Sequence, residues 1–314
     1  MSTAVVKTDL KQTLPFLARG KVRDIYTIPD QSLLLFVATD RISAYDVILN
    51  NGIPNKGKIL TQLSIFWFNY LGDVIQNHLL EANKKDQNKN LLEVLPSAVS
   101  NDSQIIGQLL DRSLIVRKFK LVPLEVIVRG YLTGSAWKEY QQFGTVHGAK
   151  YPPGMQESQQ FETPIFTPST KAEQGDHDEN IDKARAVEIL GGNQKLVDEI
   201  EKAAIALYTK ANEYAKTRGI IIADTKFEFG LDENNQLVLV DEVLTPDSSR
   251  FWSADTYKLG QGQDSFDKQF LRNWLTDRKL NGVDDVTIPE DIVVKTKAKY
   301  VEVLEKLTGE KFIE

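Results

Sequence analysis

The stretch IIADTKFEFGLDENNQLVLVDEVLTPDSSRFW, residues 221–252, decides the fold. Its β-branched and aromatic residues predict two strands, Ile220–Phe229 and Gln236–Val243, joined as a hairpin. Because strand side chains alternate between two faces, one face of the first strand is wholly charged and the other is mostly aromatic. The charged face carries Asp224, Lys226 and Glu228, and the other face carries Thr225, Phe227 and Phe229.

The register of this hairpin predicts a pair of facing carboxylates. Asn234-Asn235 tolerates the positive φ of a two-residue turn, and counting back from that turn places Glu228 opposite Asp241. Facing carboxylates repel unless a cation lies between them, and oxygen ligands suit Mg²⁺ that bridges nucleotide phosphates. The alternative is a structural network in which Lys226 or Arg250 neutralises the carboxylates.

Outside this stretch, the pattern gives strands early in the chain and helices late. We expect a polar surface excursion over residues 81–104 and a long loop over 147–178, a length usually associated with function or disorder. Strands followed by helices, with little alternation of the two, favour an α+β fold. The further expected strands are 21–28, 33–39, 114–119 and 124–129, and the expected helices begin near 57, 136, 196, 265 and 289.

Composition narrows the class of protein. The 314 residues predict two domains, or one large domain with additions. A net charge of −6 argues against a dedicated nucleic-acid binder. The absence of cysteine excludes disulfides and thiolate chemistry, and three scattered histidines do not suggest a His-rich metal site. The first residues lack the pattern of a secretory signal and no apolar run is long enough to span a membrane, so we expect a cytoplasmic protein.

Two basic segments are candidates for binding phosphate. GKVRDIY, residues 20–26, places Lys21 and Arg23 on one strand face, where they can grip phosphates, although such residues on edge strands usually serve solubility. EVIVRGYLTGS, residues 125–135, delivers Arg129 to a strand end and Ser135 to the start of a helix, which suits a monophosphate. The alternative there is an N-cap serine with an arginine that reaches toward solvent.

Two further segments complete the set of candidates. The turn PDSSR, residues 246–250, can bring Arg250 to the same phosphate. TPSTKAEQGDHDENI, residues 167–181, concentrates charge in the long loop, where a solvated surface is the alternative. The sequence has neither a P-loop nor a G-x-G-x-x-G motif, which disfavours a Walker-type NTPase and a Rossmann dehydrogenase.

Taken together, these segments resemble the SAICAR synthetase family (phosphoribosylaminoimidazole-succinocarboxamide synthase) in its single-function fungal-type form, with no fused carboxylase domain. The resemblance implies a ligase that joins L-aspartate to the carboxylate of carboxyaminoimidazole ribonucleotide, through an acyl phosphate, with ATP and Mg²⁺. The matching blocks, which run through nearly the whole chain, are GKVRD, ATDRISAYD, IPNKGKILTQLSIFWF, LVPLEVIVRGYLTGS, TPSTKAEQGDHDENI, IIADTKFEFG and VDEVLTPDSSRFW.

The resemblance also implies roles for individual residues. Lys21 and Arg23 match contacts to nucleotide phosphates, although other members carry Lys where this chain has Arg23. Glu228 and Asp241 match the ATP–Mg²⁺ region and are the expected metal ligands. The expected catalytic residues are Asp224 and Lys226, near the reacting carboxylate, and Lys171, in the loop over the nucleotide. The expected substrate-binding residues are Arg129, Ser135, Asp247 and Arg250, with Asp40 and Ser43 from the ATDRISAYD block, in which Arg41 also lies.

The family fold implies an antiparallel-sheet N-terminal domain and a central α+β domain with ATP between them, as in ATP-grasp enzymes and kinases, plus C-terminal helices. We therefore expect a nucleotide-binding domain at 1–110, a substrate and metal domain at 111–255 and C-terminal helices at 256–314. We expect small-molecule substrates, no nucleic-acid or membrane partner, and a monomer. A kinase-like phosphotransferase would show a glycine-rich loop and an H-R-D block, and a non-catalytic nucleotide-binding regulator would rarely need so dense a charge cluster.

Overall fold

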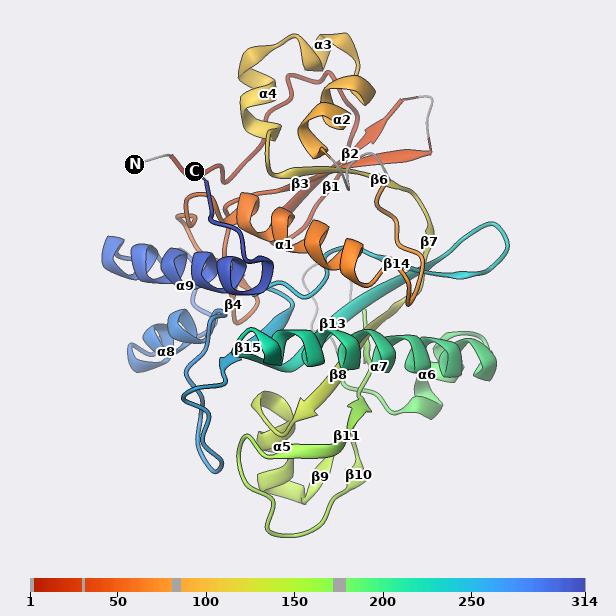
Figure 1. Ribbon diagram of the computed structural model, residues 1–314, viewed down its shortest axis with the longest axis vertical. Coiled ribbons are helices and arrows are strands. Elements are labelled where there is room, and N and C mark those ends of the chain that lie inside the picture. Colours follow the sequence, from red (N-terminus) through yellow and green to blue (C-terminus); the bar gives the residue numbers. More distant parts are fainter. Residues whose placement is uncertain (1–2, 30–31, 81–85, 172–178, 314) are drawn as a thin grey trace. The chain divides into compact units, whose positions relative to one another are not determined.

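The computed structural model describes residues 3–29, 32–80, 86–171 and 179–313 (Figure 1). The chain forms two compact units, each built from segments that are separate in sequence. Unit 1 comprises Met1–Asn69, His78–Phe119 and Lys268–Glu314, and unit 2 comprises Tyr70–Asn77 and Lys120–Asp267. The expected division into functional domains at 1–110, 111–255 and 256–314 stays a prediction.

The elements carry the labels of Figure 1. The strands are β1 (Phe16–Arg19), β2 (Arg23–Ile28), β3 (Leu33–Ala38), β4 (Ser43–Ala44), β5 (Val47–Ile48), β6 (Ser113–Arg117), β7 (Lys120–Leu121), β8 (Leu124–Tyr131), β9 (Thr145–Val146), β10 (Ala149–Lys150), β11 (Gln160–Phe166), β12 (Ser169–Thr170), β13 (Ile220–Leu231), β14 (Leu237–Val240) and β15 (Ser249–Ser253). The helices are α1 (Lys56–Tyr70), α2 (Gln87–Val94), α3 (Ser97–Ser100), α4 (Ser103–Leu109), α5 (Gly134–Phe143), α6 (Lys183–Ile189), α7 (Gln194–Thr217), α8 (Gln269–Asp277) and α9 (Glu290–Thr308).

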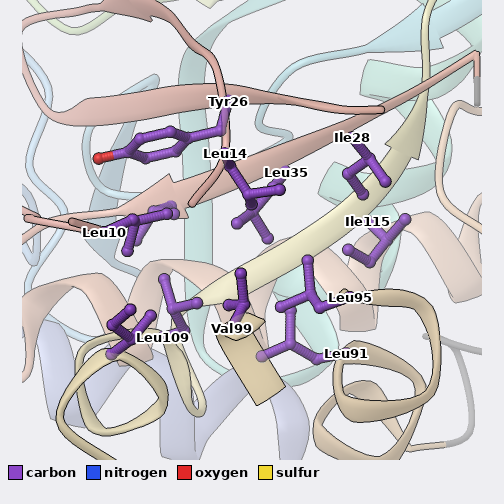
Figure 2. Close-up of a cluster of buried hydrophobic side chains, with 12 residues drawn as sticks. Leu10, Leu14, Tyr26, Ile28, Leu35, Leu91, Leu95, Val99, Leu109 and Ile115 are labelled. Atoms are coloured by element: carbon purple, nitrogen blue, oxygen red, sulfur yellow. The ribbon is translucent and has the colours of Figure 1, made fainter. Parts of the chain in front are cut away.

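In unit 1 the described strands form an antiparallel sheet in the order β1-β2-β3-β6. Residues 81–104 were predicted to be a surface excursion. Of these, 81–85 lie outside the described residues, and the rest instead carry α2, α3 and the start of α4, so the prediction was wrong there. Figure 2 shows Leu91 of α2, Leu95 directly after α2 and Val99 of α3 beside Leu35 and Ile115 from the sheet, and these side chains share one buried core cluster. Apolar residues at helical spacing within a polar segment therefore build part of the core.

The C-terminal helices also belong to unit 1. Leu271 and Leu275 of α8 and Ile292 of α9 pack with Ile42 and Ile53 into a second buried cluster. This confirms the expected pair of C-terminal helices and shows that they cover apolar residues next to β4 and β5. Among the described helices, none combines the length and the apolar composition needed to cross a membrane.

Unit 2 is built on a second antiparallel sheet with β8 and β13 at its centre. Over the described residues its main strand order is β11-β8-β13-β14, with β12 also paired to β8, and β7 and β15 to β13. The long helix α7 packs along β13, β8 and β11. Its apolar stripe was predicted, as was its end, where Arg218 is the C-cap and Gly219 takes a positive φ of 73°. The two antiparallel sheets and the C-terminal helices confirm the α+β class.

One prediction about unit 2 was wrong and another was confirmed. The segment 147–178, expected to be one long loop, contains β10, β11 and β12, because its backbone pairs with β9 and β8 despite the lack of apolar periodicity. The expected turn at 246–250 is present over residues 246–248, and Ser249 and Arg250 begin β15, which pairs with β13 from Ile220↔Ser253 to Thr225↔Ser249.

Candidate functional site

One face of the central sheet in unit 2 collects most of the candidate residues. The pairing of β13 with β8 places Asp224 opposite Arg129 and Phe227 opposite Val126. A Cβ on Gly130 would lie 1.8 Å from the hydroxyl oxygen of Tyr208, so that side of β8 faces α7. Since neighbouring strand residues point to opposite faces, Arg129 and the residues that share its face point away from α7.

At one end of this charged face, Asp224 joins two arginines. Its Oδ2 accepts a hydrogen bond from Arg129 Nη1 at 3.0 Å and another from Arg250 Nη1. Arg129 also donates through Nε to Thr167 Oγ1 at 3.1 Å and through Nη2 to Ser135 Oγ at 3.3 Å. We call Arg129, Asp224, Arg250 and Ser135 the arginine cluster. The structure brings these four predicted residues together.

The two arginines of the cluster differ in access to solvent. The side chain of Arg129 is 4% exposed and that of Arg250 is 25% exposed. Burial lowers the pKa of Arg129, whereas the Asp224 charge raises that of Arg250, which keeps Arg250 fully cationic. Gly134, with a φ of 59°, lies against the Arg250 guanidinium, because a Cβ there would be 2.5 Å from Nη2. Arg250 is therefore the arginine that is presented to an anion.

The structure contradicts the alternative interpretation of residues 125–135, an N-cap serine with an arginine that reaches toward solvent. Arg129 is buried, so it does not reach toward solvent. The N-cap of α5 is Thr133, without a side-chain capping bond, and Ser135 lies inside the first turn and accepts from Arg129. The first backbone N–H groups of α5 and the Arg250 guanidinium thus lie close together, an arrangement that favours binding of a phosphate.

At the other end of the face, the predicted hairpin register was wrong by one residue. Glu228 pairs with Val240 rather than with Asp241. The Asp232 side chain accepts from Asn234 N and Gln236 N, and Asn235 takes a φ of 58°, so the connection has three residues instead of two. Asp241 follows β14 with a φ of 67° and still acts electrostatically on Glu228, so the two carboxylates lie near each other.

Sequence patterns did not indicate Glu125, a third carboxylate whose charge acts on Glu228. Glu125 is 5% exposed and forms an ion pair with Lys226 at 2.9 Å, while Lys171 donates to Glu228 Oε2. We call Glu125, Lys171, Lys226, Glu228 and Asp241 the carboxylate cluster. The strand period that links Arg129 to Glu125 in LEVIVRG is a signal that could have found it.

The charges of the carboxylate cluster shift the pKa values of its members. Burial, together with the charges of Asp241 and Glu125, raises the pKa of Glu228 to about 7. Burial lowers the pKa of Lys226, but Glu125 and Glu228 outweigh it and raise that pKa above its usual range. Glu228 likewise raises the pKa of Lys171. The carboxylate cluster has two lysines and three acidic side chains, so an additional cation near Glu228 would be stabilised there.

This donor set fits a divalent cation supported by ligands from a substrate. In the part of the chain that the structure describes, no three acidic or histidine side chains are already arranged around a metal position. Mg²⁺ is commonly held by one or two carboxylates together with phosphate oxygens and water. Glu228 and Asp241, which repel each other, suit that role.

The predicted residues of unit 1 lie in and beside β2. Lys21 precedes the strand, which begins at Arg23 rather than at Lys21, and donates to Asp46. The Arg23 guanidinium lies over the Phe36 ring at 5.8 Å. Lys21 is 54% exposed at its side chain and remains accessible to a phosphate.

Two residues of the ATDRISAYD block, Asp40 and Arg41, make hydrogen bonds that fix the backbone next to β2 and the start of α1. Arg41 donates to the backbone oxygens of Gly20 and Lys21, each at 3.1 Å, and to Asp24 Oδ1 at 2.9 Å. Asp40 is fully buried, and its carboxylate accepts from Gly57 N at 2.9 Å, from Arg112 Nη1 at 2.7 Å and from Val5 N at 2.8 Å. Arg41 therefore holds the segment that carries Lys21, and Asp40 anchors the start of α1.

This geometry gives no support to the predicted contact between Asp40 and substrate, because three protein donors already use its carboxylate. Ser43 is buried in β4, opposite Ile48. Asp247 lies in the turn before β15, where its N–H donates to Thr245 Oγ1 at 3.2 Å. Residues 172–178, which include Asp176, His177 and Asp178 of the predicted loop motif, lie outside the described residues.

An α+β fold with an arginine cluster and a carboxylate–lysine cluster on one sheet face is the arrangement expected of an enzyme that acts on phosphorylated, acidic small molecules. The chain belongs to the SAICAR synthetase family, whose model matches residues 16–289. It is 62% identical over 305 residues to the phosphoribosylaminoimidazole-succinocarboxamide synthase of Pichia angusta, covering 97% of this chain and 98% of that protein. It is 59% identical to that of Saccharomyces cerevisiae over 310 residues, covering 98% and 99%.

Solved structures show the same relationship. The structure described as SAICAR-synthase from Saccharomyces cerevisiae complexed with SAICAR superimposes with a TM-score of 0.90 at 56% identity, covering 99% of this chain and 100% of that one. A SAICAR synthetase in complex with ADP superimposes with a TM-score of 0.66 at 26% identity, covering 95% and 99%. The predicted family, in its fungal-type form, is confirmed.

Proposed function

We propose that this protein is the ATP-dependent ligase that joins L-aspartate to the carboxylate of carboxyaminoimidazole ribonucleotide, giving SAICAR, ADP and phosphate in de novo purine biosynthesis. The observation that carries the proposal is the charged face with a cluster at each end. Glu228 lies four residue steps along β13 from Asp224, which corresponds to about 13 Å at ~3.3 Å per residue. A ribonucleotide with a phosphate at one end and a carboxylate at the other suits such a face.

The arginine cluster binds the ribonucleotide phosphate in this proposal. Arg250 and the N-terminus of α5 contact the phosphate oxygens, and Ser135 is within reach of them. Arg129 and Asp224 hold Arg250 and Ser135 in place. Asp224, predicted to lie near the reacting carboxylate, is thus assigned to the phosphate end as a positioning residue.

The carboxylate cluster supports the activation of the imidazole carboxylate. A carboxylate is a poor electrophile, so one of its oxygens attacks the γ-phosphorus of ATP and ADP leaves. The aspartate amine then attacks the carbonyl carbon of the acyl phosphate, loses a proton, and phosphate departs with one former carboxylate oxygen. Lys226 and Lys171 stabilise negative charge on the phosphoryl and carboxylate oxygens.

Glu228 and Asp241 would hold Mg²⁺, which when bound neutralises charge on the triphosphate. We propose that Lys21 and Arg23 bind nucleotide phosphates. The exposure of Lys21 supports this role, as does the hydrogen bond by which Arg41 fixes the backbone oxygen of Lys21. The placement of ATP between two domains stays a prediction. We also place the enzyme in the cytoplasm as a monomer whose partners are small molecules, consistent with its acidic composition.

A coupled assay of ADP release tests the proposed function. Steady-state ADP release should require both aspartate and the ribonucleotide. Release that depends on a hydroxyl acceptor instead would indicate a phosphotransferase, and nucleotide binding without turnover would indicate a regulator. Either result would contradict the proposal.

Kinetic constants of arginine variants test the assignment of the site. Arg250→Ala should raise the KM of the ribonucleotide about ten- to a hundredfold, the effect of losing a charge-assisted bond, and leave that of ATP nearly unchanged. Arg129→Ala should raise the same KM, because it releases Arg250 and Ser135 from their positions. Lys210→Ala, which removes an exposed ion pair with Asp73 in the same unit, is the matched control. Equal effects on both substrates would remove the arginines from the phosphate site.

A further inference from the structure

We propose that Tyr208 of α7 is a positioning residue for the arginine cluster, acting through a β-bulge in β13 on the far side of the sheet from the substrate. The inference rests on the proposed function, since it assigns Tyr208 to the affinity for the ribonucleotide phosphate. Tyr208 is 1% exposed and belongs to none of the sequence patterns that indicated the site.

The bulge decides which residues share the charged face. Along β13 and β15 the pairing runs to Ile222↔Phe251 and resumes at Asp224↔Arg250, so one extra residue, Ala223, lies in β13. Without it, the earlier register would place Arg250 opposite Ala223. A shift of one residue moves a side chain to the other face of a strand pair. The bulge is therefore what brings Arg250 to the same face as Asp224.

Two side chains of α7 hold the residue that precedes the bulge. The Tyr208 hydroxyl donates to Ile222 O at 2.6 Å, and Asn212 Oδ1 accepts from Ile222 N at 3.0 Å. Both backbone polar groups of Ile222 thus have partners on the helix. A buried backbone group without a partner is costly, so this pair of bonds stabilises the bulged backbone at Ile222.

Gly130 makes room for this contact. A Cβ at Gly130 would lie 1.8 Å from Tyr208 Oη and 2.7 Å from Cζ, which no side chain can tolerate at that position. Gly130 directly follows Arg129, so the same short segment supplies one arginine of the cluster and the space through which Tyr208 reaches Ile222. Removal of the hydroxyl leaves the ring and its packing but releases Ile222 O.

The kinetic constants of Tyr208→Phe test this inference. The variant should raise the KM of the ribonucleotide about three- to tenfold, the effect of losing one hydrogen bond, and change that of ATP less than twofold. Tyr140→Phe is the matched control, because the Tyr140 hydroxyl also donates to a backbone oxygen, that of Pro152, at 2.6 Å in the same unit. Tyr140→Phe should lower the melting temperature and leave both KM values unchanged.

A lower melting temperature in Tyr208→Phe with both KM values unchanged would reduce Tyr208 to a structural role and overturn the inference. A crystal structure of Tyr208→Phe gives a readout independent of activity, in which we expect the Arg250–Asp224 contact to be lost or lengthened. An unchanged bulge and contact would also overturn the inference. If instead Arg250→Ala leaves the ribonucleotide KM unchanged, the proposed phosphate site fails, and the crystal structure still decides whether Tyr208 sets the bulge.

Discussion

Asp224 lies directly opposite Arg129 across the ladder of β13 and β8, and its carboxylate accepts a hydrogen bond from that guanidinium at 3.0 Å. The same oxygen also accepts a hydrogen bond from Arg250, so one buried carboxylate neutralises and holds both arginines. Because both arginines are held by this one group, the stability of the sheet and the geometry of the proposed phosphate site depend on the same residue.

Asp224→Asn should therefore lower the free energy of unfolding by about 3 kcal/mol, since loss of one partner leaves buried charge uncompensated. Urea denaturation of the wild type and the variant measures this difference. Asp73→Asn, which removes the exposed partner of Lys210 in the same unit, is the control and should leave the free energy of unfolding nearly unchanged. Equal losses in the two variants would contradict the role given to Asp224.

Glu228→Gln and Asp241→Asn should each abolish ATP turnover and leave the fold intact. Each change removes repulsion between carboxylates, so the melting temperature without Mg²⁺ should stay constant or rise. Calorimetry and the ADP-release assay measure the two effects. Glu233→Gln, an exposed change in the same hairpin, is the control, and normal turnover in either site variant would refute the metal assignment.

His147 should make stability depend on pH in mildly acidic solution. Burial and the nearby charge of Arg129 lower the pKa of His147 from 6.5 to about 4, against weaker opposing effects of the Ile181 backbone and the Glu139 charge. The unfolded chain then binds more protons than the folded one between these values. The stability that neutral His147 allows is complete above pH ~6.5 and is lost as the pH falls toward about 4, by up to about 3 kcal/mol.

Urea denaturation at several pH values measures this loss. His147→Gln should show a smaller decline in the free energy of unfolding between pH 7 and pH 4.5 than the wild type. Carboxylates with lowered pKa values, such as that of Asp24, contribute equally to both proteins. Identical declines would show that His147 takes up its proton as readily in the folded protein as in the unfolded one.

Two adjacent leucines of α2 test the packing of the segment that was expected to be a surface excursion. Leu91 is 1% exposed and Leu92 is 43% exposed. Leu91→Ala should lower the free energy of unfolding by about 2–5 kcal/mol, and Leu92→Ala should change it by about 0.5 kcal/mol or less. Urea denaturation curves measure both changes. Equal losses of stability in the two variants would contradict the burial of Leu91 in the core.

Where local pattern determines geometry, the sequence was a sufficient guide. The apolar stripe predicted α7, and strand alternation predicted the shared face of Asp224, Lys226 and Glu228. The family blocks indicated the members of the arginine cluster before their contacts were known. The short helices over residues 87–109 were missed, because a polar composition obscured leucines at helical spacing.

Registers and bulges depend on contacts that composition does not reveal. The hairpin register was missed because the Asp232 side chain and the positive φ of Asn235 add one residue to the turn. The bulge in β13 follows Ile222, whose backbone carbonyl and N–H bond to Tyr208 and Asn212 on a helix earlier in the chain. Glu125 was missed because the groups that it acts on, Lys226 and Glu228, belong to another strand.

The central claim is that the charged face activates the ribonucleotide carboxylate as an acyl phosphate. The most direct measurement uses ribonucleotide labelled with ¹⁸O in that carboxylate and mass spectrometry of the phosphate released in turnover with ATP and aspartate. The account predicts phosphate that carries one ¹⁸O, and strongly reduced formation of labelled phosphate in Lys226→Met, because Lys226 stabilises the phosphoryl oxygens. Unlabelled phosphate from a competent wild-type turnover would contradict the account.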